Sequence, residues 1–300
     1  MTASTIFGRN ADGLGWLALR DKVTLSLKYA LLVVAAIFCV FPLVWSIVSA
    51  FKPGQTLLSQ PFSFNFAQAT VGNFKGLFET VPIWRGFLNT AIVVVARGGL
   101  TLVFAPMVGY GFAKFDFPFK SVLFVCVLGT LMIPVLVLII PLLLEMSQLN
   151  WVNTYQALIL PGSIDAFSVF WMRQTIQGVP DELLDAARID GCNEFGVYWR
   201  VVVPVIRPAL AALAILTCIS IYNDFVWPLV AVNSTNRETL QVMLSSLASS
   251  ANGIQAAVMG QSLWGEILAG AAIATVPVLI VFVLLQRHIV QGLLSGSLKG

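Results

Sequence analysis

The 300-residue sequence predicts an all-α integral membrane protein, and three observations support this fold class. Hydrophobic residues make up 58% of the chain and charged residues only 10%, whereas soluble domains carry about a quarter charged residues. The mean hydropathy is +0.88. Apolar runs also recur at the length of roughly 20 residues that a helix needs to cross a bilayer. We therefore expect one helical membrane domain without a second, soluble domain.

Six apolar segments have the length of a transmembrane helix. They cover residues 25–51, 87–112, 122–144, 155–172, 208–232 and 265–285. Proline is tolerated in such helices because neighbouring helices can satisfy the carbonyl that it leaves without a donor. We expect kinks rather than loops at Pro42, Pro106, Pro134, Pro161 and Pro277. Gly98 with Gly99 and Gly109 with Gly111 would let helices approach closely.

The distribution of positive charge predicts the orientation of the chain. A cytoplasmic N-terminus places most of the 17 Lys and Arg residues on the cytoplasmic side, as the positive-inside rule requires. The first apolar run is too long and too far from the N-terminus for a cleaved signal. We therefore expect a cytoplasmic tail at 1–24, a six-helix domain at 25–288 and a cytoplasmic tail at 289–300.

Composition also excludes several classes of function. The net charge of +3 and the scattered basic residues argue against nucleic-acid binding. One histidine and four dispersed cysteines provide no metal cluster, and no phosphate-binding loop for ATP is present. An enzyme would need a convergent nucleophile and base, and a channel would need a symmetric filter; neither pattern occurs. We expect a non-catalytic chain without a cofactor of its own.

One polar loop at 173–207 interrupts the apolar chain and predicts a helix-glycine-helix elbow. Pro180 stands at a helix start, Asp181 and Glu182 follow in the first turn, and Gly191 can end the helix. Leu183, Ala186, Ala187 and Asp190 recur at helical spacing, so the two alanines would form a small, flat surface that another protein can approach closely. A second short helical segment should precede Pro204.

This loop resembles the signature of the permease subunits of bacterial ATP-binding-cassette (ABC) importers. That signature reads Glu-Ala-Ala, three residues, Gly, nine residues, and Ile-x-Leu-Pro. The stretch from Asp185-Ala186-Ala187 through Gly191 to Val201-Val202-Val203-Pro204 keeps this spacing, with Asp for Glu and Val for both Ile and Leu. Further stretches resemble the carbohydrate permeases like the second membrane subunit of the maltose importer. They are Phe51-Lys52-Pro53, Asn73-Phe74, Tyr222-Asn223-Asp224-Phe225, Pro228-Leu229, the segment before Trp264 and the tail at 286–300.

The resemblance implies the type I ABC importer permease fold in the bacterial inner membrane. A separate ATPase dimer, which binds ATP and Mg²⁺, would drive this chain through the elbow. The other partners implied are a second homologous permease and an extracytoplasmic solute-binding protein that delivers a sugar. A polyol, glycerol phosphate, polyamine or amino acid is the alternative solute. The residues implied in ATPase coupling are Glu182, Asp185, Ala186, Ala187, Asp190, Gly191 and Pro204, and those of the ATPase-contacting tail are Gln291, Gly292 and Lys299.

Polar residues inside the predicted spans form the second candidate site. Arg97 and Asp165 should lie at similar depth, about ten residues into their spans. Charges at such depth are costly and usually face a partner or a water-filled path, so the two either pair or line the substrate route. Asn223 and Asp224 should lie near the outer end of the fifth span, as a hydrogen-bonding pair at the helix end or in contact with substrate.

Overall fold

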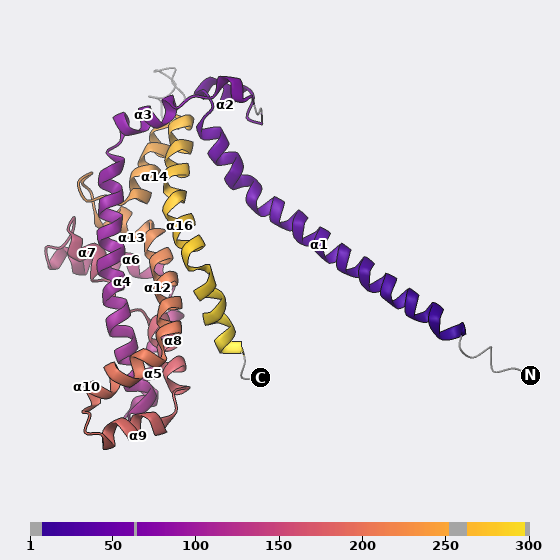
Figure 1. Cartoon of the computed structure of the whole chain (residues 1–300). Helices are drawn as coiled ribbons and strands as arrows, with labels where there is room; N and C mark the ends of the chain where they lie inside the picture. The colour runs from indigo at the N-terminus through magenta and orange to yellow at the C-terminus, as the bar shows by residue number, and fades with distance from the viewer. Residues whose placement is uncertain (1–7, 63–64, 252–262, 298–300) are drawn as a thin grey trace, which may run out of the picture.

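The computed structural model describes residues 8–62, 65–251 and 263–297, and its regular elements are all helical. Most helices form one elongated bundle, whereas α1 diverges from it (Figure 1). The three long helices are α1 (Gly8–Ala50), α4 (Ile83–Lys114) and α16 (Trp264–Ser297). The shorter elements are α2 (Gly54–Ser59), η1 (Phe66–Gln68), α3 (Gly72–Thr80), α5 (Lys120–Leu131), α6 (Val135–Gln148), α7 (Tyr155–Ile159), α8 (Ala166–Gln177), α9 (Asp181–Ile189), α10 (Glu194–Val197), the π-helical turn η2 (Tyr198–Val202), α11 (Val203–Val205), α12 (Arg207–Tyr222), α13 (Val226–Ala231) and α14 (Leu240–Ala251).

Three helical segments in the described part are long and apolar enough to cross a membrane: Lys22–Ala50, Ile83–Lys114 and Trp264–Leu284. They confirm the first, second and sixth predicted spans. Two further pairs qualify if each is one bent span: α5 with α6, at 102°, and Glu194–Val205 with α12, at 78°. The third span is therefore sharply bent, and the fifth is interrupted between α12 and α13.

The prediction of one continuous helix at 155–172, the fourth predicted span, is wrong. This segment consists of α7 and α8, which residues 160–165 separate. Pro161 lacks the backbone donor that a helix interior requires, and Gly162 adopts a φ of 76° that only glycine takes readily. Pro134 likewise stands at the start of α6, at the 102° bend. Pro42, Pro106 and Pro277 lie inside continuous helices, as predicted.

Helix α4 is the central element of the bundle and packs mainly on α8 and α12. Gly109 makes the approach to α8 possible, because an added Cβ would lie 2.9 Å from the backbone nitrogen of Arg173. Gly99 and Gly111 have no such neighbour within 4 Å, and the nearest neighbour of Gly98 is at 3.8 Å. The predicted close-packing role therefore applies to Gly109 and not to the other three glycines.

Side-chain amides hold the end of the bundle opposite α9. The Asn73 amide donates to the carbonyls of Ala50 and Lys52, both at 2.7 Å, and so satisfies carbonyls that the end of α1 leaves free. Phe51 packs on Phe74 with ring centroids 4.9 Å apart. Fully buried Asn89 of α4 donates to the carbonyls of Asn236 and Glu238. These contacts hold the two segments that connect the long helices on this side.

Candidate functional site

The elbow forms as the sequence predicts, and each end of α9 has a physical cause. Pro180 precedes α9, and Asp181 and Glu182 in its first turn favour the helix dipole. At the other end Gly191 takes a φ of 86°. The Cys192 amide donates to the Ala187 carbonyl and the Gly191 amide to the Arg188 carbonyl, both at 3.0 Å. This is the Schellman arrangement of a glycine-terminated helix.

The inner face of α9 differs from the prediction. Leu184 is 1% exposed and Ala187 only 9% exposed, and both pack into a core with Tyr198 and Val202. Ala187 therefore supports the elbow from inside, so its predicted place on the flat outer surface is wrong. Ala186 is exposed, as are Glu182, Asp185 and Asp190.

An ion-pair network joins the two helical halves of the elbow. Arg188 Nη1 donates to Asp185 Oδ1 at 2.8 Å, and Arg188 Nε donates to Glu194 Oε1 at 2.8 Å. These two carboxylates raise the pKa of the guanidinium above its ordinary value. Tyr110 of α4 donates from its hydroxyl to Glu194 Oε2 at 3.0 Å. The first half of the elbow, its second half and α4 are thus connected through Arg188 and Glu194.

Lys114, at the end of α4, connects the bundle to the start of α9. Its Nζ lies 2.6 Å from both Asp181 Oδ1 and the Val179 carbonyl oxygen, and its side chain is only 7% exposed. The hydrogen bond and charge of Lys114 lower the pKa of Asp181. Sequence reasoning missed Lys114, Tyr110 and Arg188. The position of Lys114 just beyond the end of the second predicted span was the available signal for this residue.

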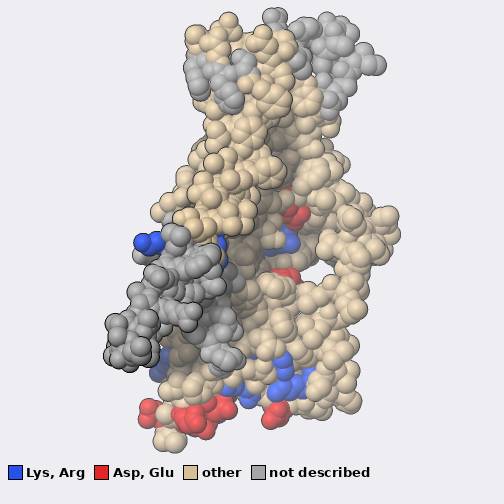
Figure 2. All heavy atoms as spheres, turned by 90° about the vertical axis from the view of Figure 1, so that its right-hand side faces the viewer, with Lys and Arg blue, Asp and Glu red and all other residues tan. Residues whose placement is uncertain are grey.

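The elbow carries exposed apolar side chains as well as charged ones. Ile189 is 86% exposed and Phe195 62% exposed, and Leu183 and Trp199 are also exposed. We call these four residues the elbow patch. Figure 2 shows Asp and Glu gathered at the end of the molecule that carries α9, with Lys and Arg beside them. Exposed apolar clusters rimmed by polar residues mark protein interaction sites.

The polar residues inside the spans assemble differently from the predicted Arg97–Asp165 pair. Arg97 Nη1 pairs with Asp224 Oδ2 at 2.9 Å. Asp165 instead caps α8, accepting from the Ser168 amide at 2.9 Å and from the Ser168 hydroxyl at 2.5 Å. Asn223 makes the expected bond at the helix end, from its amide to the Ile219 carbonyl. The predicted pairing with Asp165 is therefore wrong.

Arg97 contacts two helix interruptions, the one between α7 and α8 and the one between α12 and α13. Its Nε donates to the Gly162 carbonyl oxygen at 3.4 Å, between α7 and α8, while Asp224 lies between α12 and α13. A Cβ on Gly162 would lie 2.6 Å from Arg97 Nη2. Arg97 and Asp165 also line one cavity of about 360 Å³, together with Thr101, Ser168, Thr217 and other residues. The substrate-route interpretation of these residues stays a prediction.

The C-terminal residues of the predicted site are only partly described. Helix α16 continues through Gln291 and Gly292, whose side chains lie outside the described part, and Lys299 lies beyond its last described residue, Ser297. Within the described residues no group of three or more His, Cys, Asp or Glu side chains could hold a metal ion.

The architecture and the elbow define a class: a helical membrane protein with a soluble elbow between its spans. The family model described as "Binding-protein-dependent transport system inner membrane component" matches residues 102–295. The chain therefore belongs to this family of transport permeases, which confirms the resemblance inferred from the elbow motif.

Similar proteins support this assignment. The arabinooligosaccharides transport system permease protein AraQ of Halalkalibacterium halodurans is 37% identical over 88% of this chain and 93% of its own length. The lactose transport system permease protein LacG of Rhizobium radiobacter is 31% identical over 94% and 98%. A solved bacterial ABC transporter, involved in the import of the acidic polysaccharide alginate, matches with a TM-score of 0.78 and 22% identity. That match covers 89% of this chain and 97% of the other, and it confirms the ABC importer permease fold.

Proposed function

We propose that this chain forms part of the translocation pathway of an ATP-driven sugar importer and receives movement from a separate ATPase dimer through its elbow. A second, homologous permease and an extracytoplasmic solute-binding protein complete the assembly. Both termini face the cytoplasm, on the same side as the elbow. ATP and Mg²⁺ belong to the ATPase.

The observation that carries this proposal is the elbow's attachment to the bundle. Lys114 links α9 to α4, Arg188 links α9 to α10, and residues 194–205 lead into α12 at an angle of 78°. A force on α9 would therefore reach α4 and α12 together. Because α4 and α12 also pack on each other, the elbow can move the bundle's centre as a unit.

The elbow patch supplies the contact for the ATPase. Replacing exposed Ile189 with Asp places a charge where an apolar contact would be desolvated, so Ile189→Asp should abolish co-purification of the ATPase with this chain. Val71, which is 69% exposed in the segment between α2 and α3, provides the matched control: Val71→Asp should retain the ATPase. Full retention of the ATPase by Ile189→Asp would contradict the docking role.

A sugar is the solute that most of the similar permeases' names support, including those for arabinooligosaccharides and lactose. One relative favours an alternative: the sn-glycerol-3-phosphate transport system permease protein UgpE of Pectobacterium atrosepticum is 28% identical. Uptake of labelled arabinotriose, lactose and glycerol 3-phosphate by cells that express the complete transporter decides between them. We expect ATP-dependent uptake of a saccharide. Uptake of glycerol 3-phosphate alone would establish the alternative.

A further inference from the structure

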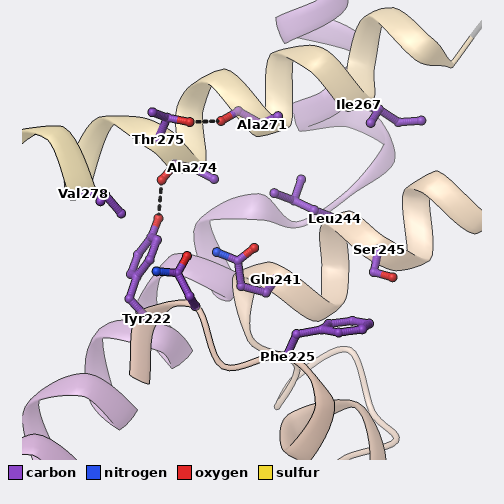
Figure 3. A pocket seen from close by; sticks show the side chains of 11 residues that line it. Tyr222, Phe225, Gln241, Leu244, Ser245, Ile267, Ala271, Ala274, Thr275 and Val278 are labelled. Atoms are coloured by element: carbon purple, nitrogen blue, oxygen red, sulfur yellow. Dashed lines mark hydrogen bonds between the residues drawn. The ribbon is translucent and has the colours of Figure 1, made fainter. Parts of the chain in front are cut away.

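A second cavity, of about 590 Å³, lies between the α12–α13 interruption, α14 and α16. Figure 3 shows Gln241 of α14 pointing into the space between Tyr222 and Phe225, with Ala274 and Val278 of α16 on the opposite side. Its volume is within the range of about 300–1,000 Å³ for small-molecule sites. It is separate from the cavity at Arg97, because the two share no lining residue.

The lining of this cavity is mostly apolar, with a few polar side chains and no charged one. It includes the side chains of Asn223, Gln241, Ser245 and Thr275, and no Asp, Glu, Lys or Arg. The Thr275 hydroxyl donates to the Ala271 carbonyl, and the Tyr222 hydroxyl donates to the Ala274 carbonyl. In the described part of the chain, the side-chain amide of Gln241 and the hydroxyl of Ser245 have no hydrogen-bond partner. Both groups are thus available to a ligand.

Aromatic rings border the same space. Phe225 and Tyr222 contribute to the lining, and ring faces contact the C–H faces of a sugar through burial of apolar area. An amide can both donate and accept, as the hydroxyl groups of a sugar require. A phosphate ester or a free amino acid would instead bring a charge to a lining that has no side chain of opposite charge.

The cavity also lies in the half of the bundle away from the elbow. Tyr222 ends the 16-residue helix α12, which starts at Arg207, so it lies about 22 Å along the helix from that start at 1.5 Å per residue. On α16 the lining begins at Ile267, close to the helix start at Trp264, and extends to Val278. A solute arriving from the side opposite the ATPase would therefore meet this cavity early in its passage.

We propose that this cavity is a binding site for one ring of a neutral saccharide, contributed by this subunit to the transport route. Gln241 and Ser245 hydrogen-bond the sugar hydroxyls, and Phe225 packs on the ring. The inference rests on the proposed transport function and adds a binding site to it. It also specifies the charge of the solute: neutral sugars are transported, and phosphorylated or zwitterionic solutes are not.

The test measures uptake of labelled arabinotriose, lactose and glycerol 3-phosphate by the complete transporter carrying Gln241→Leu or Ser245→Ala. We expect the maximal rate for the transported saccharide to fall about tenfold in Gln241→Leu and severalfold in Ser245→Ala. Ser246→Ala, one residue further on α14, exposed and outside the lining, is the matched control and should transport normally. Gln241→Asn keeps the amide and should restore part of the rate.

The outcomes separate this inference from the proposed function. If the wild-type transporter imports a saccharide and the Gln241→Leu and Ser245→Ala variants import it equally fast, the proposed binding site is wrong and the proposed function stands. Import of glycerol 3-phosphate by the wild type would contradict the proposal that only neutral solutes are transported. ATP-dependent uptake of none of the three probes contradicts the proposed function itself. To separate lost binding from lost folding, each variant is compared for the amount of ATPase that co-purifies with it.

Discussion

Arg97 shows how a single charged side chain can join three helices. It belongs to the continuous helix α4, and it contacts Asp224 at one helix interruption and the Gly162 carbonyl at another. Interrupted helices expose backbone groups that must find partners away from water. Its side chain is 20% exposed, so the pair has lost most of its hydration. The guanidinium thus satisfies a backbone carbonyl at the interruption between α7 and α8, and it pairs with a carboxylate at the interruption between α12 and α13.

The Arg97–Asp224 pair predicts non-additive effects of mutation. Arg97→Leu leaves the Asp224 carboxylate with its ion-pair partner removed and should destabilise the fold by about 2–3 kcal/mol. The double variant Arg97→Leu with Asp224→Leu should cost clearly less than the sum of the single variants. Unfolding in detergent, followed by circular dichroism, measures these differences.

The same experiment separates the observed pair from the one expected between Arg97 and Asp165. Asp165→Asn removes part of the cap of α8, so its cost should add to that of Arg97→Leu. Strong coupling of Arg97 to Asp165, with additive behaviour for Asp224, would contradict the pairing seen here.

At the scale of the elements, most departures from a regular helix coincide with a residue that cannot continue one. Pro161 and Gly162 separate α7 from α8, Pro134 begins α6 after the 102° bend, and Gly191 ends α9. Between α12 and α13 no proline or glycine is present. There Asn223 and Asp224 occupy the break, with Asn223 bonded back to the Ile219 carbonyl and Asp224 paired with Arg97.

The backbone conformation of Gly191 predicts the effect of a substitution at the end of α9. Its φ of 86° strains any residue with a Cβ, although the space around it is open. Gly191→Ala should therefore destabilise the protein by about 1–2 kcal/mol through backbone strain. Gly111→Ala has equally open surroundings but lies within α4, so it should be neutral or stabilising. Equal stability of the two variants in thermal unfolding would contradict the strain argument.

At the scale of the whole molecule, a tightly packed bundle carries a soluble elbow at one end and a divergent first helix. The apolar stretch that qualifies α1 as a span has no residue buried by the rest of the chain, whereas Ser49 and Ala50 at the end of the helix are buried. Lipid or another subunit must therefore cover it, because so much exposed apolar surface is unstable in water. The first helix thus requires a bilayer or a partner subunit around it.

Attachment of the elbow to the bundle should weaken in acid. Lys114 lowers the pKa of Asp181 below its ordinary value of 3.8. A carboxylate with a lowered pKa contributes stability that is present above its ordinary pKa and is lost as the pH falls through the lowered value. The thermal unfolding midpoint of the wild type should therefore fall as the pH drops below about 4. We expect this fall to be smaller in the Asp181→Asn variant. Glu79→Gln, which removes an exposed carboxylate in α3, should leave the fall unchanged.

The amino-acid sequence by itself determined the membrane class, the position of the elbow and its ends. Apolar run length, Pro180 and Gly191 act locally, so they can be read without knowing any distant contact. Only the tertiary structure decided that Arg97 pairs with Asp224 and that Gln241 faces a cavity. These depend on partners far along the chain, and an almost uniformly apolar helix has no periodic pattern to distinguish its lipid face from its packed face.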